Sequence, residues 1–386
     1  MTPKVLVFRS VALARSETFI RTQLLALRRW QGVLVAERAA DDGIELGGLP
    51  VCWLSPRVPL KLRQLRRRVP GWRDTPWAAD VAMLRAQNAQ LMHVHFGTDA
   101  LEAAPLARAL GLPMLVTLHG FDVNIAPAWW ESGAGGRLMR RYPARLRHIA
   151  QQPGVGFLAV SQAVCQSAIN FGLPAERISL SPIGVDLQRI RPGPLPLAAR
   201  PKRVLYVGRL VEKKGADLLL HALADPRLAG VQAVLVGEGP LWPALQAQAQ
   251  AQRLNVQFLG AQPHAAVLAQ MSQARVYCLP SVTAANGDAE GLNTTVMEAQ
   301  AAGLPVVTSA RASTTEGMID GGTGIAFAER DVPALVAALV RVLNDDTLAQ
   351  AMADAGPRFV AEHFDVLRCA QRLEVLYDAA LNKTLQ

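Results

Sequence analysis

Short apolar runs alternate along the chain with longer stretches in which apolar side chains recur at helical spacing. In the first half, these runs predict strands at 4–8, 33–36, 50–54, 91–95, 114–118, 156–160 and 178–181. In the second half, they predict strands at 203–207, 232–236, 255–259, 275–279, 305–308 and 324–327. Near-continuous apolar strands that alternate with helices are typical of parallel sheets covered on both faces. The pattern therefore predicts an α/β protein with two doubly wound, Rossmann-like domains.

The helical stretches lie between the predicted strands. In the first half they fall at 16–29, 76–88, 99–110, 137–151 and 161–170, with Ser16 as the expected N-cap of the first helix. In the second half they fall at 214–223, 240–253, 263–272, 292–302, 331–344 and 346–361, and a last helix lies near 366–381.

A proline-rich stretch separates the two halves. Residues 181–203 carry five prolines and little periodicity, which indicates a linker. We expect an N-terminal domain at 1–185, a linker at 186–203, a second domain at 204–362, and a C-terminal helix at 363–386 that packs back on the first domain. Ligands of doubly wound sheets bind at the carboxyl ends of the strands. We therefore expect the two domains to face a cleft that holds the chemistry.

Composition narrows the class of protein. The chain has 386 residues, of which 51% are hydrophobic, so it is expected to bury a large core rather than to be disordered. It contains no apolar run of about 18 residues, and the apolar run at its start is too short for a secretory signal. Its four cysteines are scattered, which fits a reducing cytoplasm and no thiolate metal site.

Positive charge is concentrated in the first half. Residues 1–200 carry a net charge of +12, whereas residues 201–386 carry −3. The stretch 57–73 holds seven cations among leucine, valine and tryptophan, and Trp129, Trp130 and the basic segment 137–147 extend it. This favours peripheral binding to an anionic membrane, although a solvated basic face explains the charge equally well. No nucleic-acid-binding module accompanies the charge, so nucleic acid is not an expected partner.

The stretch 280–307 contains two glutamates eight positions apart, Glu290 and Glu298. Between them a helix is predicted to begin, and a helix N-terminus presents unpaired N–H groups and a partial positive charge that suit a phosphate. Eight helical residues span about 12 Å, which is close to the reach from the ribose to the hexose of a nucleotide sugar. One carboxylate would then bind the sugar hydroxyls and the other the ribose, although a solvated acid on a helix or loop remains the alternative for each.

A second candidate site follows the strand at 203–207. Arg209 and Lys214 lie near the start of the next predicted helix, where cations are mildly unfavourable unless an anion is bound. They would neutralise the diphosphate that leaves during a transfer reaction. The alternative is a pair of surface cations.

Together these stretches resemble the retaining glycosyltransferases of family 4, which have the GT-B fold. Three motifs carry the resemblance in the second half: Gly208-Arg209-Leu210 with Lys214-Gly215, Glu290 with Glu298, and Gly303-Leu304-Pro305-Val306-Val307. In the first half, His119–Asn124 (HGFDVN), HVH at 93–95 and SPIGVD at 181–186 are similar to further family segments. Residues 16–20 and 288–292 resemble transferases of bacterial exopolysaccharide, O-antigen and colanic acid synthesis.

The resemblance implies that the domain at 1–185 binds the acceptor and that the domain at 204–362 binds the nucleotide sugar. It also implies a role for each matching residue. Arg209 and Lys214 would neutralise the diphosphate, Glu290 would bind the donor sugar near the reacting carbon, and His119 would lie by that sugar with Asp122 behind it. Glu298 would bind the ribose. The remaining donor-binding candidates are Gly208, Gly291, Leu292, Asn293, Thr294 and Thr295 for the sugar and diphosphate, and Leu259, Gly260 and Ala261 for the base.

The family's chemistry needs no cofactor and no metal here, because Arg209 and Lys214 supply cations and the sequence has no Asp-x-Asp. The donor would be a UDP- or GDP-linked hexose. The acceptor would be a glycan or a polyprenyl-diphosphate-linked saccharide of bacterial surface polysaccharide synthesis, at the cytoplasmic face of the plasma membrane. A sugar-nucleotide epimerase of the same fold, a non-catalytic nucleotide-sugar-binding scaffold and, more distantly, a nicotinamide oxidoreductase are the alternatives.

Two departures from the family pattern affect the expected site. The loop after the first strand, RSVALARSET at 9–18, lacks the glycine pair that is common there, so its candidates for acceptor binding are polar side chains: Arg9, Arg15, Ser16 and Glu17. Asn293 stands where Gly or Pro is common, and only its backbone is expected to act. We interpret His93 and His95 as facing opposite sides of their strand, with His95 near the cleft and a further acceptor candidate.

Overall fold

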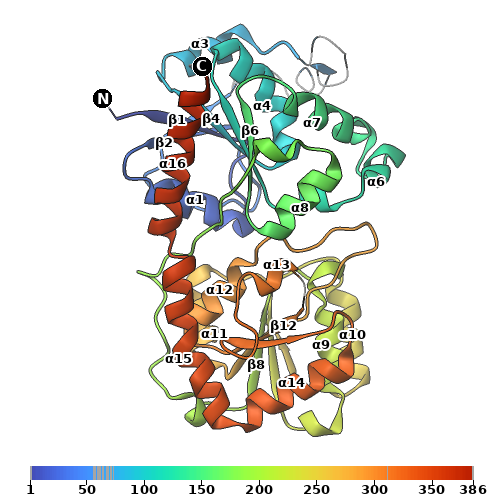
Figure 1. The fold of residues 1–386 in the computed structure, drawn as a ribbon. Helices are drawn as coiled ribbons and strands as arrows, with labels where there is room; N and C mark the ends of the chain where they lie inside the picture. Colours follow the sequence, from blue (N-terminus) through green and yellow to red (C-terminus); the bar gives the residue numbers. More distant parts are fainter. Residues whose placement is uncertain are drawn as a thin grey trace. The chain divides into compact units, whose positions relative to one another are not determined.

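Two parallel sheets organise the chain in the computed structural model, which describes residues 2–54, 58, 62, 65–66, 69, 72, 74–310 and 312–384 (Figure 1). One sheet has seven strands in the order β3-β2-β1-β4-β5-β6-β7, and the other has six in the order β10-β9-β8-β11-β12-β13. All pairs of neighbouring strands are parallel. The predicted fold class, two doubly wound α/β domains, is confirmed.

The first sheet belongs to a compact unit made of Met1–Gly184 and Val366–Gln386, here called the first unit. Its strands are β1 (Lys4–Val11), β2 (Gln31–Arg38), β3 (Val51–Trp53), β4 (Leu91–His95), β5 (Met114–Leu118), β6 (Val155–Ala159) and β7 (Ile178–Leu180). Its described α-helices are α1 (Thr18–Ala26), α3 (Ala78–Arg85), α4 (Gly97–Leu110), α5 (Phe121–Asn124), α6 (Pro127–Ser132), α7 (Tyr142–Ala150), α8 (Gln162–Phe171) and α16 (Val366–Thr384).

The second sheet belongs to the second unit, Val185–Asp365. Its strands are β8 (Arg203–Val207), β9 (Gln232–Val236), β10 (Val256–Phe258), β11 (Val276–Leu279), β12 (Val306–Ser309) and β13 (Gly324–Phe327). Its described α-helices are α9 (Ala216–Leu223), α10 (Trp242–Ala251), α11 (His264–Gln273), α12 (Thr294–Ala301), α13 (Ala312–Thr315), α14 (Val332–Asn344) and α15 (Asp346–His363). The proline-rich segment before β8 is part of this unit, where Leu197 is buried.

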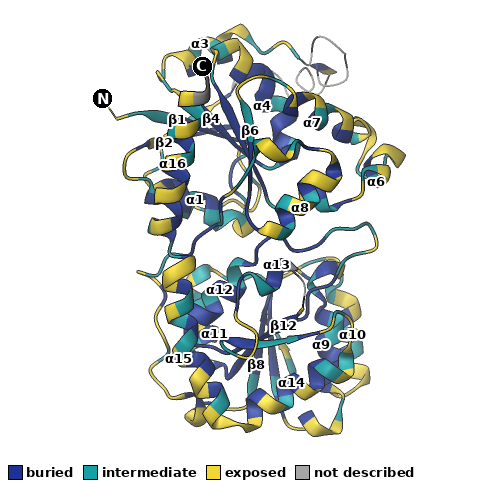
Figure 2. Cartoon of the chain, in the orientation of Figure 1, coloured by how far each residue is buried: buried dark blue, intermediate teal, exposed yellow. Residues whose placement is uncertain are grey.

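The central strands, such as β4, β5, β11 and β12, are buried on both faces because helices cover both faces of each sheet. In Figure 2 the central strands of each unit are dark blue, and the outer faces of helices such as α14 and α15 are yellow. Helix α16 completes the core of the first unit, since Leu373 and Tyr377 pack with Val5 and Val7 of β1. Among the described residues, no helix is both long enough and apolar enough to cross a membrane.

The start and end of the first predicted helix differ from the sequence prediction. Ser16 is not an N-cap, because it lies within a 3-10 turn, η1 (Arg15–Glu17), and Glu17 occupies the N-cap position of α1 without a side-chain capping bond. The helix ends at Ala26 because Leu27 is extended. The predicted helix at 137–151 is also divided, into the 3-10 turn η2 (Arg137–Met139) and α7.

Candidate active site

In the second unit, the segment after β8 places two of the candidate cations. Arg209 is exposed directly beyond the strand, and the hydroxyl of Tyr206 donates a hydrogen bond to its carbonyl oxygen at 3.3 Å. A 3-10 turn, η5 (Glu212–Lys214), then leads to Gly215, which has a φ of +62°. A side chain at Gly215 would collide with the carbonyl oxygen of Pro280 at the end of β11. Glycine therefore allows η5 to approach β11 closely, and Lys214 is held beside the loop that follows β11.

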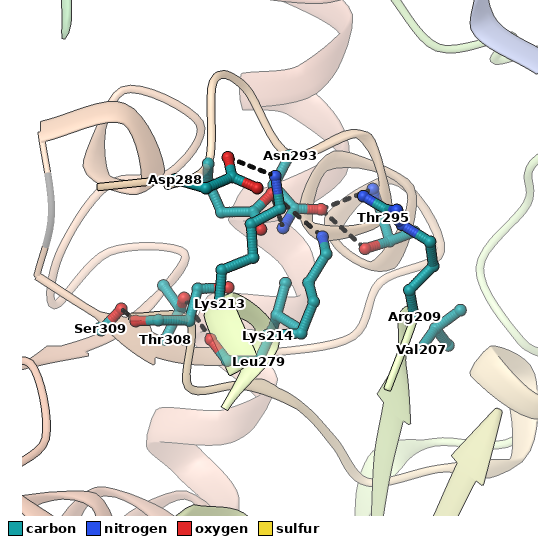
Figure 3. Close-up of polar contacts among 12 residues, drawn as sticks. Val207, Arg209, Lys213, Lys214, Leu279, Asp288, Asn293, Thr295, Thr308 and Ser309 are labelled. Carbon is teal, nitrogen blue, oxygen red and sulfur yellow. Dashed lines mark hydrogen bonds and ion pairs between the residues drawn. The ribbon is translucent and has the colours of Figure 1, made fainter. Parts of the chain in front are cut away.

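Two ion pairs join η5 to that loop (Figure 3). Nζ of Lys214 lies 3.0 Å from Oε2 of Glu290, and Nζ of Lys213 lies 3.0 Å from Oδ1 of Asp288. Burial alone would raise the pKa of Glu290, but Lys214, Lys213 and Arg209 outweigh it and hold that pKa below its ordinary value. Burial lowers the pKa of Lys214, although Glu290 opposes this shift. Oε1 of Glu290 is buried and has no hydrogen-bond partner among the described residues.

Helix α12 begins at Thr294, four residues beyond Glu290. Asn293 caps it, since its Oδ1 accepts hydrogen bonds from the backbone N–H and the hydroxyl of Thr295 at 3.2 and 2.8 Å. Its Nδ2 donates to Oε2 of Glu290 at 3.3 Å. The side chain of Asn293 therefore caps α12 and contacts Glu290, which the sequence did not predict, and the contact of its backbone with the donor stays a prediction. The hydroxyl of Tyr277, on β11, lies 2.6 Å from that of Thr295, so the first turn of α12 is tied to the sheet.

The candidates for the nucleoside occupy two neighbouring elements. Leu259, Gly260 and Ala261 follow β10, where the N–H of Ala261 donates to Oε1 of Glu238 at 3.1 Å. Glu298, on α12, lies 2.9 Å from Nε2 of His264, the first residue of α11. Gly208, Gly291, Leu292 and Thr294 lie at the end of β8 and at the start of α12. The second unit thus brings together the cations, both glutamates and the start of α12.

In the first unit, the candidates lie at the carboxyl ends of β1, β4 and β5, which are adjacent in the sheet. Nδ1 of His95 lies 3.0 Å from Nε2 of His119. Burial is the main reason that the pKa of each ring lies well below its ordinary value, so both are neutral at pH 7. The buried carboxylate of Asp122 accepts hydrogen bonds from the backbone N–H groups of Gly97, His119 and Gly120. Burial nevertheless raises its pKa to about 6.

The interpretation that His93 and His95 face opposite sides of β4 is wrong. Their ring centroids are 4.5 Å apart, because residues two positions apart in a strand point to the same face. His93 is bonded within the core, to the hydroxyls of Tyr377 and Thr117. Nε2 of His95 is buried and has no hydrogen-bond partner among the described residues.

The acceptor candidates near β1 have different surroundings. The buried guanidinium of Arg9 pairs with Asp99 at 2.5 Å and with Glu17 at 2.6 Å, and it lies over the ring of Phe96. Two carboxylates therefore already neutralise Arg9, and Glu17 is engaged with it. Arg15 and Ser16 are exposed.

Most of the basic stretch 57–73 lies outside the described residues, namely Arg57, Lys61, Arg63, Arg67, Arg68 and Arg73. Arg66 is described and buried: its guanidinium donates to the carbonyl oxygen of Thr75 and lies over the ring of Trp77. Trp130 is buried as well, against Phe121 and Tyr142, so it is not the exposed interfacial residue that the sequence suggested.

Sequence reasoning missed several members of the site. His264, Asp288, Lys213 and Tyr277 were not candidates. His264 and Glu298 are 34 residues apart, and the sequence offered no signal that pairs them.

Within the described part of the chain, His, Cys, Asp and Glu form no group of three or more that would hold a metal ion.

Comparisons with known proteins agree with this architecture. The family profile "Glycosyltransferase Family 4" matches residues 19–189, and "Glycosyl transferases group 1" matches residues 190–359. A GDP-mannose-dependent alpha-(1-6)-phosphatidylinositol monomannoside mannosyltransferase of Mycolicibacterium smegmatis is 30% identical over 87% of this chain and 85% of its own length. The chain therefore belongs to glycosyltransferase family 4.

A second relative and a solved structure are also similar to this chain. The chain is 30% identical to a protein of Escherichia coli named as the colanic acid biosynthesis glycosyltransferase WcaL, over 71% of this chain and 64% of the relative's length. The crystal structure of Anabaena HepE in complex with UDP and glucose superimposes with a TM-score of 0.78 over 97% of this chain and 99% of that chain, at 19% identity. This similarity establishes the GT-B fold.

Proposed function

We propose that the protein is a retaining, metal-independent glycosyltransferase that moves a hexose from a UDP- or GDP-linked donor to a glycan acceptor. The buried, ionised carboxylate of Glu290 carries the proposal. Its Oε2 is held by Lys214 and Asn293, whereas its Oε1 has no partner among the described residues. A buried oxygen without a partner is costly, and a sugar hydroxyl of the donor would supply the missing hydrogen bond.

The start of α12 would hold the donor's diphosphate. The backbone N–H groups of residues 291–294 and the positive end of the helix dipole favour an anion there. Arg209 and Lys214 add positive charge beside it, as the lowered pKa of Glu290 indicates. In the reaction, the bond between the anomeric carbon and the diphosphate breaks, and its electron pair leaves with the diphosphate. These cations would stabilise the charge that develops on it.

The acceptor hydroxyl would form its bond to the anomeric carbon on the face that the diphosphate leaves, and its proton would pass to a phosphate oxygen. Configuration at the anomeric carbon is then retained without a protein nucleophile. The family resemblance assigns His119, with Asp122 behind it, to the donor sugar, and we propose this role. Because His119 is neutral, it can donate or accept one hydrogen bond to a sugar hydroxyl.

For the acceptor we propose a lipid-linked saccharide of bacterial surface polysaccharide synthesis, bound at the inner face of the plasma membrane. The relative named for colanic acid biosynthesis and the positive first half of the chain support this assignment. Arg15 and Ser16 are the exposed candidates for its phosphate, and Arg9, Glu17 and His95 would shape the site around them.

The test is turnover by a matched pair of variants. Glu290 and Asp288 both pair with a lysine at 3.0 Å, so Glu290→Gln and Asp288→Asn make the same chemical change at neighbouring positions. With a panel of UDP- and GDP-hexoses and lipid-linked saccharides, we expect Glu290→Gln to lower nucleoside diphosphate release by about 100-fold or more. Asp288→Asn should retain most of the rate. Equal rates for both variants, or conversion of the donor without an acceptor, would contradict the proposal.

A further inference from the structure

The loop between β10 and α11, residues 259–263, is fixed to the end of β9. The N–H of Leu259 donates to the carbonyl oxygen of Leu235 at 2.9 Å, and the N–H of Gly237 donates to that of Gly260 at 2.8 Å. Nε2 of Gln262 closes the turn by donating to the carbonyl oxygen of Leu259 at 2.6 Å. The loop proposed to face the base is therefore rigid, and it leads directly into His264.

His264 connects this loop to α12. Its Nε2 lies 2.9 Å from Oε1 of Glu298, whose side chain is 12% exposed, whereas that of His264 is 35% exposed. Two further charged groups act on the ring, Asp186 and Arg189, and these two are themselves paired at 3.3 Å. The imidazole of His264 contacts Glu298 directly, whereas Asp186 and Arg189 act on it through their charge.

The position of His264 shows why this contact matters. As the first residue of α11, the ring lies at the positive end of a helix dipole, which disfavours an imidazolium. The hydrogen bond to Glu298 nevertheless raises the pKa of His264 above its ordinary value, against the opposing effect of burial. Glu298 therefore stabilises the protonated form of the imidazole, and the imidazole in turn orients the carboxylate of Glu298.

We infer that His264 is a positioning residue for the ribose: it holds Oε1 of Glu298 so that Oε2 is directed to accept a hydrogen bond from a ribose hydroxyl of the donor. This inference rests on the proposed function, to which it adds the ribose-binding role that the family resemblance implies for Glu298. A carboxylate has two oxygens that accept in different directions, so fixing one of them fixes the other. The protein would thereby select ribonucleotides over deoxyribonucleotides.

The test is the ratio of affinities for UDP and GDP over their 2′-deoxy and 3′-deoxy forms, measured by calorimetry on the full chain. The phosphates are the same in each comparison, so their titration cancels in the ratio. We expect wild-type protein to bind the ribonucleotide at least about tenfold more tightly than one deoxy form, which corresponds to ~1.4 kcal/mol. His264→Ala should bring this ratio close to one.

Two further variants separate positioning from a general structural effect. In His264→Gln, the side-chain amide can donate to Glu298 from nearly the position that Nε2 of the histidine occupies, but it does not titrate. The affinity ratio of ribonucleotide to deoxynucleotide should therefore persist in this variant and be independent of pH. In the wild type, the ratio should fall as pH rises and the charge-assisted bond to Glu298 weakens. His221→Ala, at an exposed histidine on α9 of the same unit, is the matched control and should leave the ratio unchanged.

The outcomes distinguish this inference from the function on which it rests. If the wild type binds no nucleotide at all, the proposed function fails. If nucleotides bind but His264→Ala keeps the wild-type ratio, or if the wild type itself has no ribose preference, the inference is overturned and the proposed function stands.

Discussion

At the scale of residues, the histidines of β4 and β5 show how burial converts a titratable group into part of the core. His93 has both ring nitrogens bonded to hydroxyls, and burial lowers its pKa to about 3. His95 and His119 are neutral for the same reason. An unfolded histidine has a pKa near 6.5, so these residues take up protons when the first unit unfolds in mild acid.

We therefore expect the first unit to lose stability as pH falls below about 6.5. Because the pKa of His93 is lower in the folded than in the unfolded protein, its contribution to stability is fully present at a pH above the unfolded pKa. This contribution is lost as the pH falls toward the folded pKa. For His93 alone, the loss between pH 7.5 and 5.5 amounts to about 1 kcal/mol. The raised pKa of Asp122 acts in the opposite direction, because its folded form holds a proton more readily.

Urea unfolding at both pH values, followed by hydrogen exchange in β4 and β5, measures this effect. His93→Asn removes the titrating ring, so its stability should change less over the same interval than that of the wild type. An equal or larger change in the variant would contradict the account.

At the scale of elements, α16 is anchored in the first unit by one buried carboxylate. Oε1 of Glu374 accepts hydrogen bonds from the backbone N–H groups of Arg28, Arg29 and Trp30, at 2.7, 2.6 and 3.1 Å. This contact binds the segment that follows α1, so the end of α1 and the position of α16 depend on each other.

Glu374→Ala removes the acceptor of the backbone N–H groups of Arg28, Arg29 and the buried Trp30, and we expect it to lower the free energy of unfolding of the first unit by about 3 kcal/mol. Gln371→Ala, at an exposed position on the same helix, is the control and should change it by less than about 0.5 kcal/mol. Denaturant unfolding of both variants measures the difference. Similar stabilities would show that the carboxylate does not anchor α16.

Sequence patterning predicted most elements because the central strands are apolar and buried on both faces, and because the long helices place apolar side chains at helical spacing. It failed where a distant residue decides the local structure. The end of α1 at Ala26 depends on Glu374, and no local signal reveals that contact. The short helices α5 and α6 are too brief for periodicity to detect. Asn293 likewise gained side-chain contacts that its position in the motif did not suggest.

At the scale of the whole molecule, the residues proposed to carry the chemistry belong to two units, each built on a parallel sheet. The second unit gathers the residues proposed to bind the donor, and the motif resemblance located them because short segments carry them. The first unit carries His95 and His119 at its strand ends, but the resemblance offered less guidance there. The pairing of Arg9 with Asp99 and Glu17 joins residues up to 90 positions apart, which sequence alone does not connect.

The most direct test of the central claim is the affinity of Lys214→Met for UDP and GDP, compared by calorimetry with Lys213→Met. The two lysines are neighbours in η5, each pairs with a carboxylate at 3.0 Å, and both are well buried (Figure 3). If Lys214 and the start of α12 hold the diphosphate, Lys214→Met weakens binding at least about tenfold, or ~1.4 kcal/mol, and Lys213→Met has a much smaller effect. Equal affinities for Lys214→Met and the wild type would contradict the claim.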